Sequence, residues 1–424
     1  MTSAVAVLCD PLNPEDTATR LQEVLGQGQW VRLLGRESSA DPADLHLGAV
    51  GSLDAVRSPE AVRLPEGPGL VLSTGGSTGG RSLCLHPVGN LERSAQATAQ
   101  WLRCISIDPT TALVWNPLPF HHVSGFMPWW RARQWNAAHR WLASELMKHP
   151  ARLLEWSVQH PGWRQRPMLL SLVPTQLRRL LAHPDGCCWL QAMDVIWVGG
   201  AGLPEDLAAA SRAIGLKLAP CYGATETAAM VTAQQPRDFL KGGDGCGQPL
   251  EGVELKVNAD GALAVRCDRL ALARVDFAGS LHPISDPAGW WWSGDRARLV
   301  ETDGQPHLHV GGRRDGAILT GGVTVFPAQL EERLLVMAEH EGLPLAAVLM
   351  LGEPQLEWGE QLVALFRWSI SSGCEPPLES LIALVCDWPA AERPRRWLHC
   401  PDLEPTAAGK WERQRWRDWL ALQH

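Results

Sequence analysis

LVLSTGGSTGG occupies residues 70–80 and is followed directly by Arg81. An apolar run enters a segment of Gly, Ser and Thr, which predicts a buried strand that opens into a loop rich in hydrogen-bond donors. Glycine lets backbone N–H groups approach an anion closely, and the hydroxyls of Ser77 and Thr78 add donors, so the loop suits phosphate. A solvated turn between two strands is the alternative. The Gly-Lys-Ser/Thr ending of a Walker loop is missing, which disfavours ordinary P-loop NTPase chemistry.

Length and composition limit the classes of protein to which this chain can belong. The 424-residue chain exceeds what one hydrophobic core usually supports, which predicts at least two folding units. Its 45% hydrophobic and 20% charged residues are typical of globular proteins. A formal net charge of −8 disfavours nucleic-acid or membrane-surface binding, because either would need a basic face. We therefore expect small-molecule partners, with no nucleic acid and no membrane.

Cysteine usage and the N-terminus indicate a cytoplasmic protein. The eleven Cys residues lack metal-site spacing, since Cys187 and Cys188 are adjacent and no CxxC pair occurs. They predict reduced, mostly buried thiols. Residues 4–9 form the only early apolar run, which is too short for a secretory signal. No run approaches the roughly 20 apolar residues of a spanning helix.

Strands alternate with helices through the middle of the chain, which predicts a parallel α/β sheet with ligands at the carboxyl ends of its strands. Downstream, apolar runs flank Asn-Ala-Asp-Gly at residues 258–261, a hairpin signal that predicts a β-rich piece. The predicted parallel strands are 112–115, 168–173, 195–198 and 216–219.

Two features near residue 120 suit the wall of a ligand pocket. NPLPFHHVSGF, residues 116–126, carries two adjacent His residues at a strand exit, although such a pair more often serves packing than chemistry. Arg131 follows Trp129 and Trp130. It is either a stacked surface residue or the cation that receives the anionic end of a ligand.

The best domain boundary lies in GGRRDGAILTGGVTVFP, residues 311–327, where charge and glycine concentrate between apolar runs. We therefore expect a large N-terminal domain, residues 1–312, of mainly parallel sheets with helices plus a β-rich piece. A small α+β domain, residues 313–424, follows. The first sixty or so residues are expected to form a lead-in subdomain.

The chain resembles the adenylate-forming superfamily of acyl- and aryl-CoA synthetases, luciferases and adenylation domains. Seven short segments stand in the order found in that superfamily, although each segment alone is a weak signal. The match runs from about Leu70 to the C-terminus. Two stretches, FHHVSGFMPWWR and SLVPTQLRRLL, most resemble the 2-succinylbenzoate-CoA ligases of menaquinone and phylloquinone biosynthesis. The seven segments are STGGSTGG, PFHHVSG, VGGAGLP, CYGATE, SGD, GRRDGAILTGG and TAAGK.

The resemblance implies an acyl-CoA synthetase-like fold with a mobile C-terminal domain, and an AMP-forming acid–thiol ligase that uses ATP, Mg²⁺ and CoA. A carboxylate would attack the α-phosphate of ATP to give an acyl adenylate and pyrophosphate, and a thiol would then displace AMP. The first step brings two anions together, so it needs charge neutralisation more than acid–base catalysis. The implied acid is the aromatic dicarboxylate 2-succinylbenzoate. A homodimer is compatible with the sequence.

The resemblance also implies catalytic roles for individual residues. Lys410, in TAAGK, would bridge the carboxylate and the α-phosphate as charge develops. His122 would gate or line the acyl pocket. Thr225 would touch the α-phosphate, and Glu226 would hold Mg²⁺.

The nucleotide and the acid would lie among residues of several segments. Tyr222, the only Tyr in the chain, would pack against adenine, and Asp295 and Arg313 would bind the ribose hydroxyls. The implied nucleotide-binding residues are Thr74, Gly75, Gly76, Ser77, Thr78, Gly79, Gly200, Ala201, Tyr222, Gly223, Asp295, Arg313, Gly321 and Gly322. The implied acid-binding residues are Ser124, Arg131 and Gly199.

Two positions depart from the family pattern, and two alternative functions stay open. The usual Pro-Lys after the glycine loop reads Arg81-Ser82, and the second acid of the hinge after Asp315 reads Gly316. An adenylation domain that loads a carrier protein would share every nucleotide residue. A non-catalytic nucleotide-binding regulator is favoured by Arg81-Ser82 and disfavoured by the intact Lys410.

Overall fold

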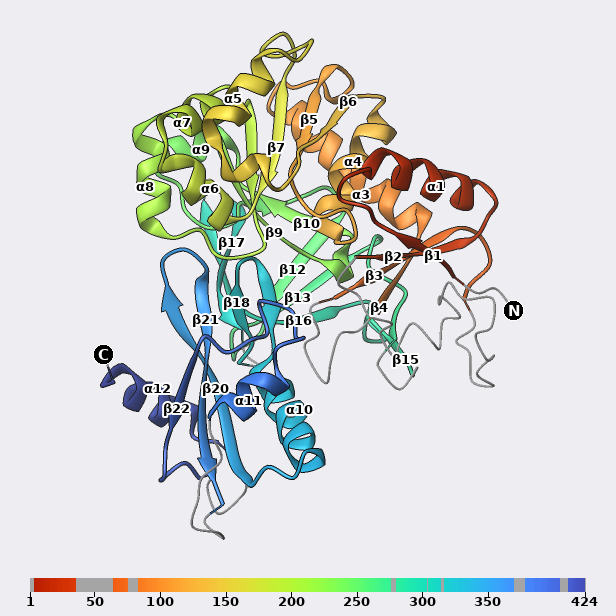
Figure 1. The fold of residues 1–424 in the computed structure, drawn as a ribbon. Coiled ribbons are helices and arrows are strands. Elements are labelled where there is room, and N and C mark those ends of the chain that lie inside the picture. The colour runs from red at the N-terminus through yellow and green to blue at the C-terminus, as the bar shows by residue number, and fades with distance from the viewer. Residues whose placement is uncertain are drawn as a thin grey trace. The chain divides into compact units, whose positions relative to one another are not determined.

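The computed structural model describes residues 4–35, 64–74, 83–275, 280–302, 304–313, 316–369, 378–404 and 411–423. These residues form two compact units, and the division falls at residues 314 and 315. Each unit is built around its own sheets, and Figure 1 labels most of the elements of both.

The first unit holds most of the helices. Its strands are β1 (Val5–Leu8), β2 (Trp30–Leu34), β3 (Gly69–Ser73), β4 (Leu83–Pro87), β5 (Leu113–Asn116), β6 (Ala138–Trp141), β7 (Met168–Leu172), β8 (Val195–Val198), β9 (Leu218–Ala224), β10 (Ala229–Ala233), β11 (Gln248–Pro249), β12 (Val253–Val257), β13 (Ala262–Cys267), β14 (Ala273–Val275), β15 (Leu281–Pro283), β16 (Trp291–Thr302) and β17 (Gln305–Arg313). Its α-helices are α1 (Pro14–Gly26), α3 (Val88–Cys104), α4 (Val123–Trp135), α5 (Pro150–Val158), α6 (Pro174–Leu181), α7 (Pro184–Gln191), α8 (Glu205–Ala213) and α9 (Pro236–Leu240).

The largest sheet has the order β11-β10-β9-β8-β7-β5-β6. Strands β6, β5, β7, β8 and β9 pair in parallel, whereas β10 and β11 are antiparallel. Strands β5, β7 and β8 of the parallel part are almost continuously apolar. This is the pattern expected of a sheet whose two faces are both covered. Helices α5 to α8 pack on one face and helices α3 and α4 on the other (Figure 1). The prediction of a mixed α/β fold is confirmed, and the pairing in this sheet is mainly parallel.

A second sheet, β1-β2-β3-β4-β14-β15, contains the strand that precedes the glycine loop. Strands β1 and β2 pair in parallel with each other, and β2 pairs in parallel with β3. The prediction of a separate lead-in subdomain is therefore wrong for the described early residues. Their strands, β1 and β2, are joined by backbone hydrogen bonds to the sheet that contains β3. Strands β3 and β4 are antiparallel neighbours, with Ser73 opposite Leu83. The glycine loop thus connects two paired strands.

The third sheet has the order β12-β13-β16-β17 and is antiparallel throughout. The predicted hairpin at residues 258–261 joins β12 and β13, with Val257 opposite Leu263, so that prediction is confirmed. Gly261 has a φ of +77°, which explains a glycine at this turn. Strand β16 carries Asp295 and forms a long ladder with β17.

The second unit packs helices against one sheet of order β19-β18-β21-β20, with β22 parallel to β21. Among the helices of the described ranges in either unit, none is long and apolar enough to cross a lipid bilayer. The elements of the second unit are β18 (Ile318–Thr320), β19 (Val323–Val325), α10 (Pro327–His340), β20 (Leu345–Gln355), β21 (Gly359–Trp368), α11 (Leu378–Leu384), β22 (Arg396–His399) and α12 (Arg413–Ala421).

Candidate active site

Tyr222 on β9 and Asp295 on β16 meet where two sheets of the first unit adjoin. The Tyr222 Oη donates a hydrogen bond of 2.6 Å to Asp295 Oδ2, across 73 residues of sequence. Burial and the neighbouring Asp295 carboxylate raise the pKa of Tyr222 well above its ordinary value, so the phenol remains a donor. Asp295 is the strand partner of Arg313. Three predicted nucleotide residues therefore lie in one neighbourhood.

The chain turns sharply after Tyr222. A 3-10 turn covers Thr225–Thr227, and Ala228 and Ala229 follow with φ of +52° and +77°, a conformation uncommon for residues with a Cβ. A Cβ on Gly223 would lie 2.1 Å from the carbonyl oxygen of Ala229 on the adjacent strand, so only glycine fits there. This tight passage places Thr225 and Glu226 directly beyond β9.

Three carbonyl oxygens of this turn are held by other elements of the first unit. Each contact comes from a distant part of the sequence, so the turn is fixed by tertiary structure rather than by its own sequence. The bonds run from His86 Nε2 to Thr225 O (2.7 Å), from Ala271 N to Glu226 O (2.7 Å) and from Ser94 Oγ to Ala228 O (2.7 Å).

His86 is the least expected of these anchors. It lies on β4 with no exposed surface, and burial lowers the pKa of its imidazole to about 4, although the Thr225 carbonyl opposes that shift. Because a carbonyl can only accept, Nε2 carries the proton. The Nδ1 atom has no hydrogen-bond partner in the part of the chain that the structure describes. A second proton on the ring would therefore be buried without an acceptor.

Acidification is expected to destabilise the first unit through His86. The imidazole has a pKa of about 4 when folded against about 6.5 when unfolded, so the unfolded chain binds the extra proton between these values. The stability contribution is complete above pH 6.5 and is lost as the pH falls to 4, by about 3 kcal/mol. Urea unfolding at pH 7.0 and 4.5 should show a smaller loss in His86→Gln, whose amide can still donate to Thr225. The exposed His340→Gln variant is the control, and an equal loss in His86→Gln and the parent would contradict the assignment.

The other predicted nucleotide-binding residues that the structure describes lie directly after strands of the first unit. Thr74 follows β3 and is 4% exposed. Gly199 follows β8, and its N–H donates to the carbonyl of Leu172 at 3.2 Å. Gly200, with a φ of +81°, turns the chain and leads to Ala201. These residues lie at the carboxyl ends of their strands, as the sequence predicted.

The two adjacent His residues stand at the start of α4. His122 is exposed and precedes the helix, with its ring centroid 4.2 Å from that of His121. Ser124, also exposed, lies in the first turn. Asn116 donates to the carbonyl of Gly125 at 2.8 Å, which ties this helix start to the end of β5.

Arg131 lies on α4 and is only 5% exposed, so it is not the surface residue of the alternative interpretation. Its guanidinium carbon lies 6.0 Å from the ring centroid of Trp197 on β8. Burial lowers its pKa to about 10, the neighbouring Cys221 opposes this, and the charge of Arg269 lowers it further. Arg131 is thus a buried cation beside β8 and β9.

Several predicted residues are not placed at this site. Gly75, Gly76, Ser77, Thr78, Gly79 and Lys410 lie outside the described residues. Arg313 is located only by its strand register. Gly321 and Gly322 form the β18–β19 turn of the second unit, with φ of +58° and +83°. Within the described ranges, no group of three or more His, Cys, Asp or Glu could hold a metal ion.

Sequence reasoning missed two residues of this region. His86 is a lone polar residue in the apolar strand after the glycine loop, a signal that could have suggested a buried contact. Arg269 follows β13 without any distinguishing pattern, yet it is 1% exposed. Only the packing of the first unit reveals its position.

Residues 2–265 match the family model described as AMP-binding enzyme. The chain is 32% identical over 243 residues to a probable 2-succinylbenzoate–CoA ligase of Mycobacterium tuberculosis, covering 55% of this chain and 56% of that protein. It is 29% identical over 216 residues to an indoleacetate–CoA ligase of Aromatoleum aromaticum, covering 47% and 40%. The match thus spans about half of the length of these relatives.

Solved structures share the fold. An o-succinylbenzoate CoA synthetase from Bacillus subtilis, bound with a product analogue, superposes with a TM-score of 0.75 at 19% identity, covering 98% of this chain and 88% of that chain. A malonyl-CoA ligase bound with methylmalonyl-CoA and AMP superposes with a TM-score of 0.71 at 24% identity, covering 94% and 90%. At these identities the likeness concerns the fold.

Proposed function

This chain belongs to the AMP-binding enzyme family, and from that premise we propose that it is an ATP-dependent acid–CoA ligase. The acid's carboxylate oxygen would bond to the α-phosphorus of ATP while the bond to the β-phosphate breaks and pyrophosphate leaves. The thiol of CoA would then bond to the acyl carbon while AMP leaves. A cytoplasmic location is part of the proposal, because both co-substrates are cytoplasmic metabolites.

The observation that carries the proposal is the hydrogen bond between Tyr222 and Asp295. It joins CYGATE to SGD, two segments that the family resemblance assigns to one nucleotide. The carboxylate that accepts from the phenol can also accept from a ribose hydroxyl, because each carboxylate oxygen has two lone pairs. Arg313, opposite Asp295 in the ladder, would add donors to the same ribose.

Glu226 is the proposed protein ligand of Mg²⁺. Mg²⁺ usually keeps several waters and binds one or two carboxylates together with substrate phosphates. A single carboxylate on a firmly held turn fits that pattern better than a multi-residue metal cage would. The ion would neutralise the phosphates of ATP, while Thr225, Thr74 and the residues of the glycine loop would donate hydrogen bonds to them.

The second unit is proposed to be the mobile catalytic domain, with Lys410 acting in adenylation. Lys410 must reach the phosphate in the first step, whereas the thiol of CoA must reach the acyl carbon in the second. One rigid arrangement cannot serve both steps. The chain next to Asp315 would then be the hinge.

We propose 2-succinylbenzoate as the acid, which would place the enzyme in menaquinone or phylloquinone biosynthesis. The support is the probable 2-succinylbenzoate–CoA ligase among its relatives, together with the buried Arg131. Only the succinyl carboxylate of this acid reacts, so the benzoate carboxylate is buried unchanged. A pocket for such an acid needs a fixed cation, because an unpaired buried carboxylate costs several kcal/mol.

The test is acid-dependent exchange of labelled pyrophosphate into ATP over a panel of acids. The panel holds 2-succinylbenzoate, benzoate, indoleacetate and a fatty acid, each with CoA absent and then present. Exchange with 2-succinylbenzoate and formation of its CoA thioester are expected. Exchange without thioester formation would indicate a carrier-protein-loading enzyme. No exchange with any acid would overturn the ligase proposal and leave a nucleotide-binding regulator.

Arg131→Ala is expected to raise KM for 2-succinylbenzoate about tenfold or more, because a hydrogen bond to a charged group contributes about 1.5–3 kcal/mol. KM for ATP should stay near the parent value, because the nucleotide site does not include Arg131. Steady-state kinetics of pyrophosphate release measures both. Arg133→Ala, an exposed position on the same helix, is the matched control. Parental use of 2-succinylbenzoate by Arg131→Ala would remove Arg131 from the pocket.

A further inference from the structure

His86 contacts the turn that carries Thr225 and Glu226 but takes no part in the proposed chemistry. Its strand, β4, begins at Leu83, which lies opposite Ser73 at the end of β3, so β4 starts where the glycine loop ends. The His86 side chain has no exposed surface, and its Nε2 donates to the carbonyl of Thr225 at 2.7 Å. One strand therefore joins the glycine loop to the turn.

The segment beside β4 supplies a second contact to the same turn. Strand β14 pairs with β4, and just before it the N–H of Leu272 donates to the carbonyl of Leu85 at 2.9 Å. The preceding residue, Ala271, donates from its N–H to the carbonyl of Glu226 at 2.7 Å. Two consecutive carbonyls of the turn, those of residues 225 and 226, are thus held by neighbouring segments of one sheet.

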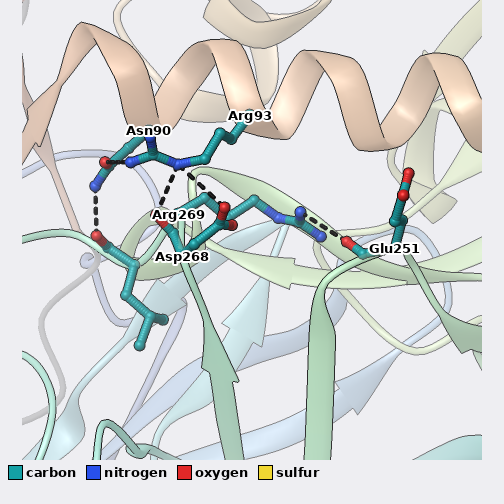
Figure 2. A network of polar contacts seen from close by, with 6 residues as sticks. Asn90, Arg93, Glu251, Asp268 and Arg269 are labelled. Carbon is teal, nitrogen blue, oxygen red and sulfur yellow. Dashed lines mark hydrogen bonds and ion pairs between the residues drawn. The ribbon is translucent and has the colours of Figure 1, made fainter.

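The loop that leads to Ala271 is itself fixed against helix α3, as Figure 2 shows. Asn90 Nδ2 donates to the carbonyl of Leu270 at 2.5 Å, and Arg93 Nε donates to the carbonyl of Asp268 at 2.9 Å. Helix α3 follows β4 directly in the chain. One continuous segment therefore carries His86 and also supports the loop that makes the second contact.

Helix α3 also makes a third contact. Ser94 has no exposed surface, and its Oγ donates to the carbonyl of Ala228 at 2.7 Å. These carbonyls are bonded inside the protein, whereas the side chains of Thr225 and Glu226 are only half-buried. The turn cannot rotate its peptide groups without leaving a buried polar group unpaired, which is costly. The residues that hold the carbonyls therefore fix the directions of the two side chains.

We propose that His86 is a positioning residue for the α-phosphate of the nucleotide, because it holds the peptide group between Thr225 and Glu226. The inference rests on the proposed ligase function, in which Thr225 donates to that phosphate, and deepens it. The imidazole touches no substrate. It keeps the Thr225 hydroxyl in place and ties the turn to the strand that follows the glycine loop, so the two phosphate-binding segments keep one spacing.

Calorimetric titration of the full chain with adenosine and with AMP tests this role apart from catalysis. The two ligands differ only in the phosphate, so the ratio of their affinities measures the contacts to the phosphate. The parent is expected to bind AMP more tightly than adenosine. Thr225→Ala should lower the affinity for AMP about tenfold, because a hydrogen bond to a charged group is lost, and leave the affinity for adenosine unchanged.

Two variants of His86 separate its hydrogen bond from its polarity. The amide nitrogen of Gln can take the place of Nε2, so His86→Gln should keep the parental ratio of affinities within about twofold. The shorter amide of Asn reaches only the place of Nδ1, so His86→Asn should lower the affinity for AMP about tenfold and leave that for adenosine unchanged. Ser211→Ala is the matched control, because it removes another buried hydrogen bond to a carbonyl, that of Leu207 on α8 at 2.7 Å.

The double variant that combines His86→Asn with Thr225→Ala shows whether His86 acts through Thr225. If it does, the double variant should lose no more affinity for AMP than Thr225→Ala alone. Additive losses would overturn the proposal, because they would mean that the two residues act on AMP independently.

The adenosine titrations distinguish positioning from a purely structural role. An equal fall of both affinities in His86→Asn would leave only a structural role, and parental binding of AMP by that variant would exclude positioning. Selective loss of AMP binding in His86→Gln would contradict the donor role, which keeps the proposal testable if the Asn variant does not fold. Equal binding of adenosine and AMP by the parent would remove the proposed nucleotide site itself. A parental preference for AMP that survives in His86→Asn would remove only the role of His86.

Discussion

Replacing Lys410 with Ala is expected to slow acid-dependent pyrophosphate release by about two to three orders of magnitude. In the proposed mechanism the ammonium group lies between two anions, the carboxylate and the α-phosphate, as charge develops. One preorganised contact of this kind contributes about 3–4 kcal/mol to the transition state. Single-turnover release of pyrophosphate with saturating ATP and 2-succinylbenzoate measures the effect.

The second half-reaction should be nearly unaffected in the same variant. Pre-made acyl adenylate should react with CoA at a rate close to that of the parent, because Lys410 has left the phosphate in the proposed second arrangement. Lys241→Ala removes an exposed lysine of the first unit and serves as control. Equal slowing of both half-reactions would contradict the separate role of Lys410 and the two arrangements of the second unit.

Arg413→Met is expected to destabilise the second unit by about 3 kcal/mol. Arg413 begins α12, three residues after Lys410, and its Nη2 lies 2.8 Å from Glu331 Oε2 on α10. Glu331 is 7% exposed in its side chain and also accepts from the N–H of Met350 at 2.7 Å. Removing the arginine leaves a buried carboxylate without its cation, which costs about 3–5 kcal/mol. The lower figure applies because the Arg413 side chain is 24% exposed.

Native-state hydrogen exchange of β20 measures this loss. The Met350 amide should exchange about 100-fold faster in Arg413→Met, since each 1.4 kcal/mol corresponds to a factor of ten. Arg415→Met is the control, because Arg415 is 63% exposed and pairs with the exposed Glu412. Replacing Glu331 with Leu in the Arg413→Met background should restore much of the protection. Unchanged exchange in the single variant would show that the ion pair contributes little.

The sequence by itself determined the order of the elements and the strand exits of the candidate site. Apolar runs followed by Gly, Ser or Thr are local signals, and β3 and β8 end where those signals predicted, whereas β9, predicted to end at Ala219, continues to Ala224. The hairpin at residues 258–261 is local in the same sense, since its turn chemistry lies within four residues. The AMP-binding family could also be recognised from the order of its segments along the chain.

Tertiary structure alone decided which side chains meet. Tyr222 and Asp295 are 73 residues apart, and His86 and Thr225 are 139 residues apart, so no window of sequence contains either pair. The early strands belong to the sheet of β3 because β2 pairs with β3. This pairing is made by backbone hydrogen bonds, so no pattern of side chains in the sequence indicates it. Arg269 was buried by packing beside α3, although arginine is usually exposed. Local patterns report how each segment folds, whereas the contacts that build a site depend on how distant segments pack.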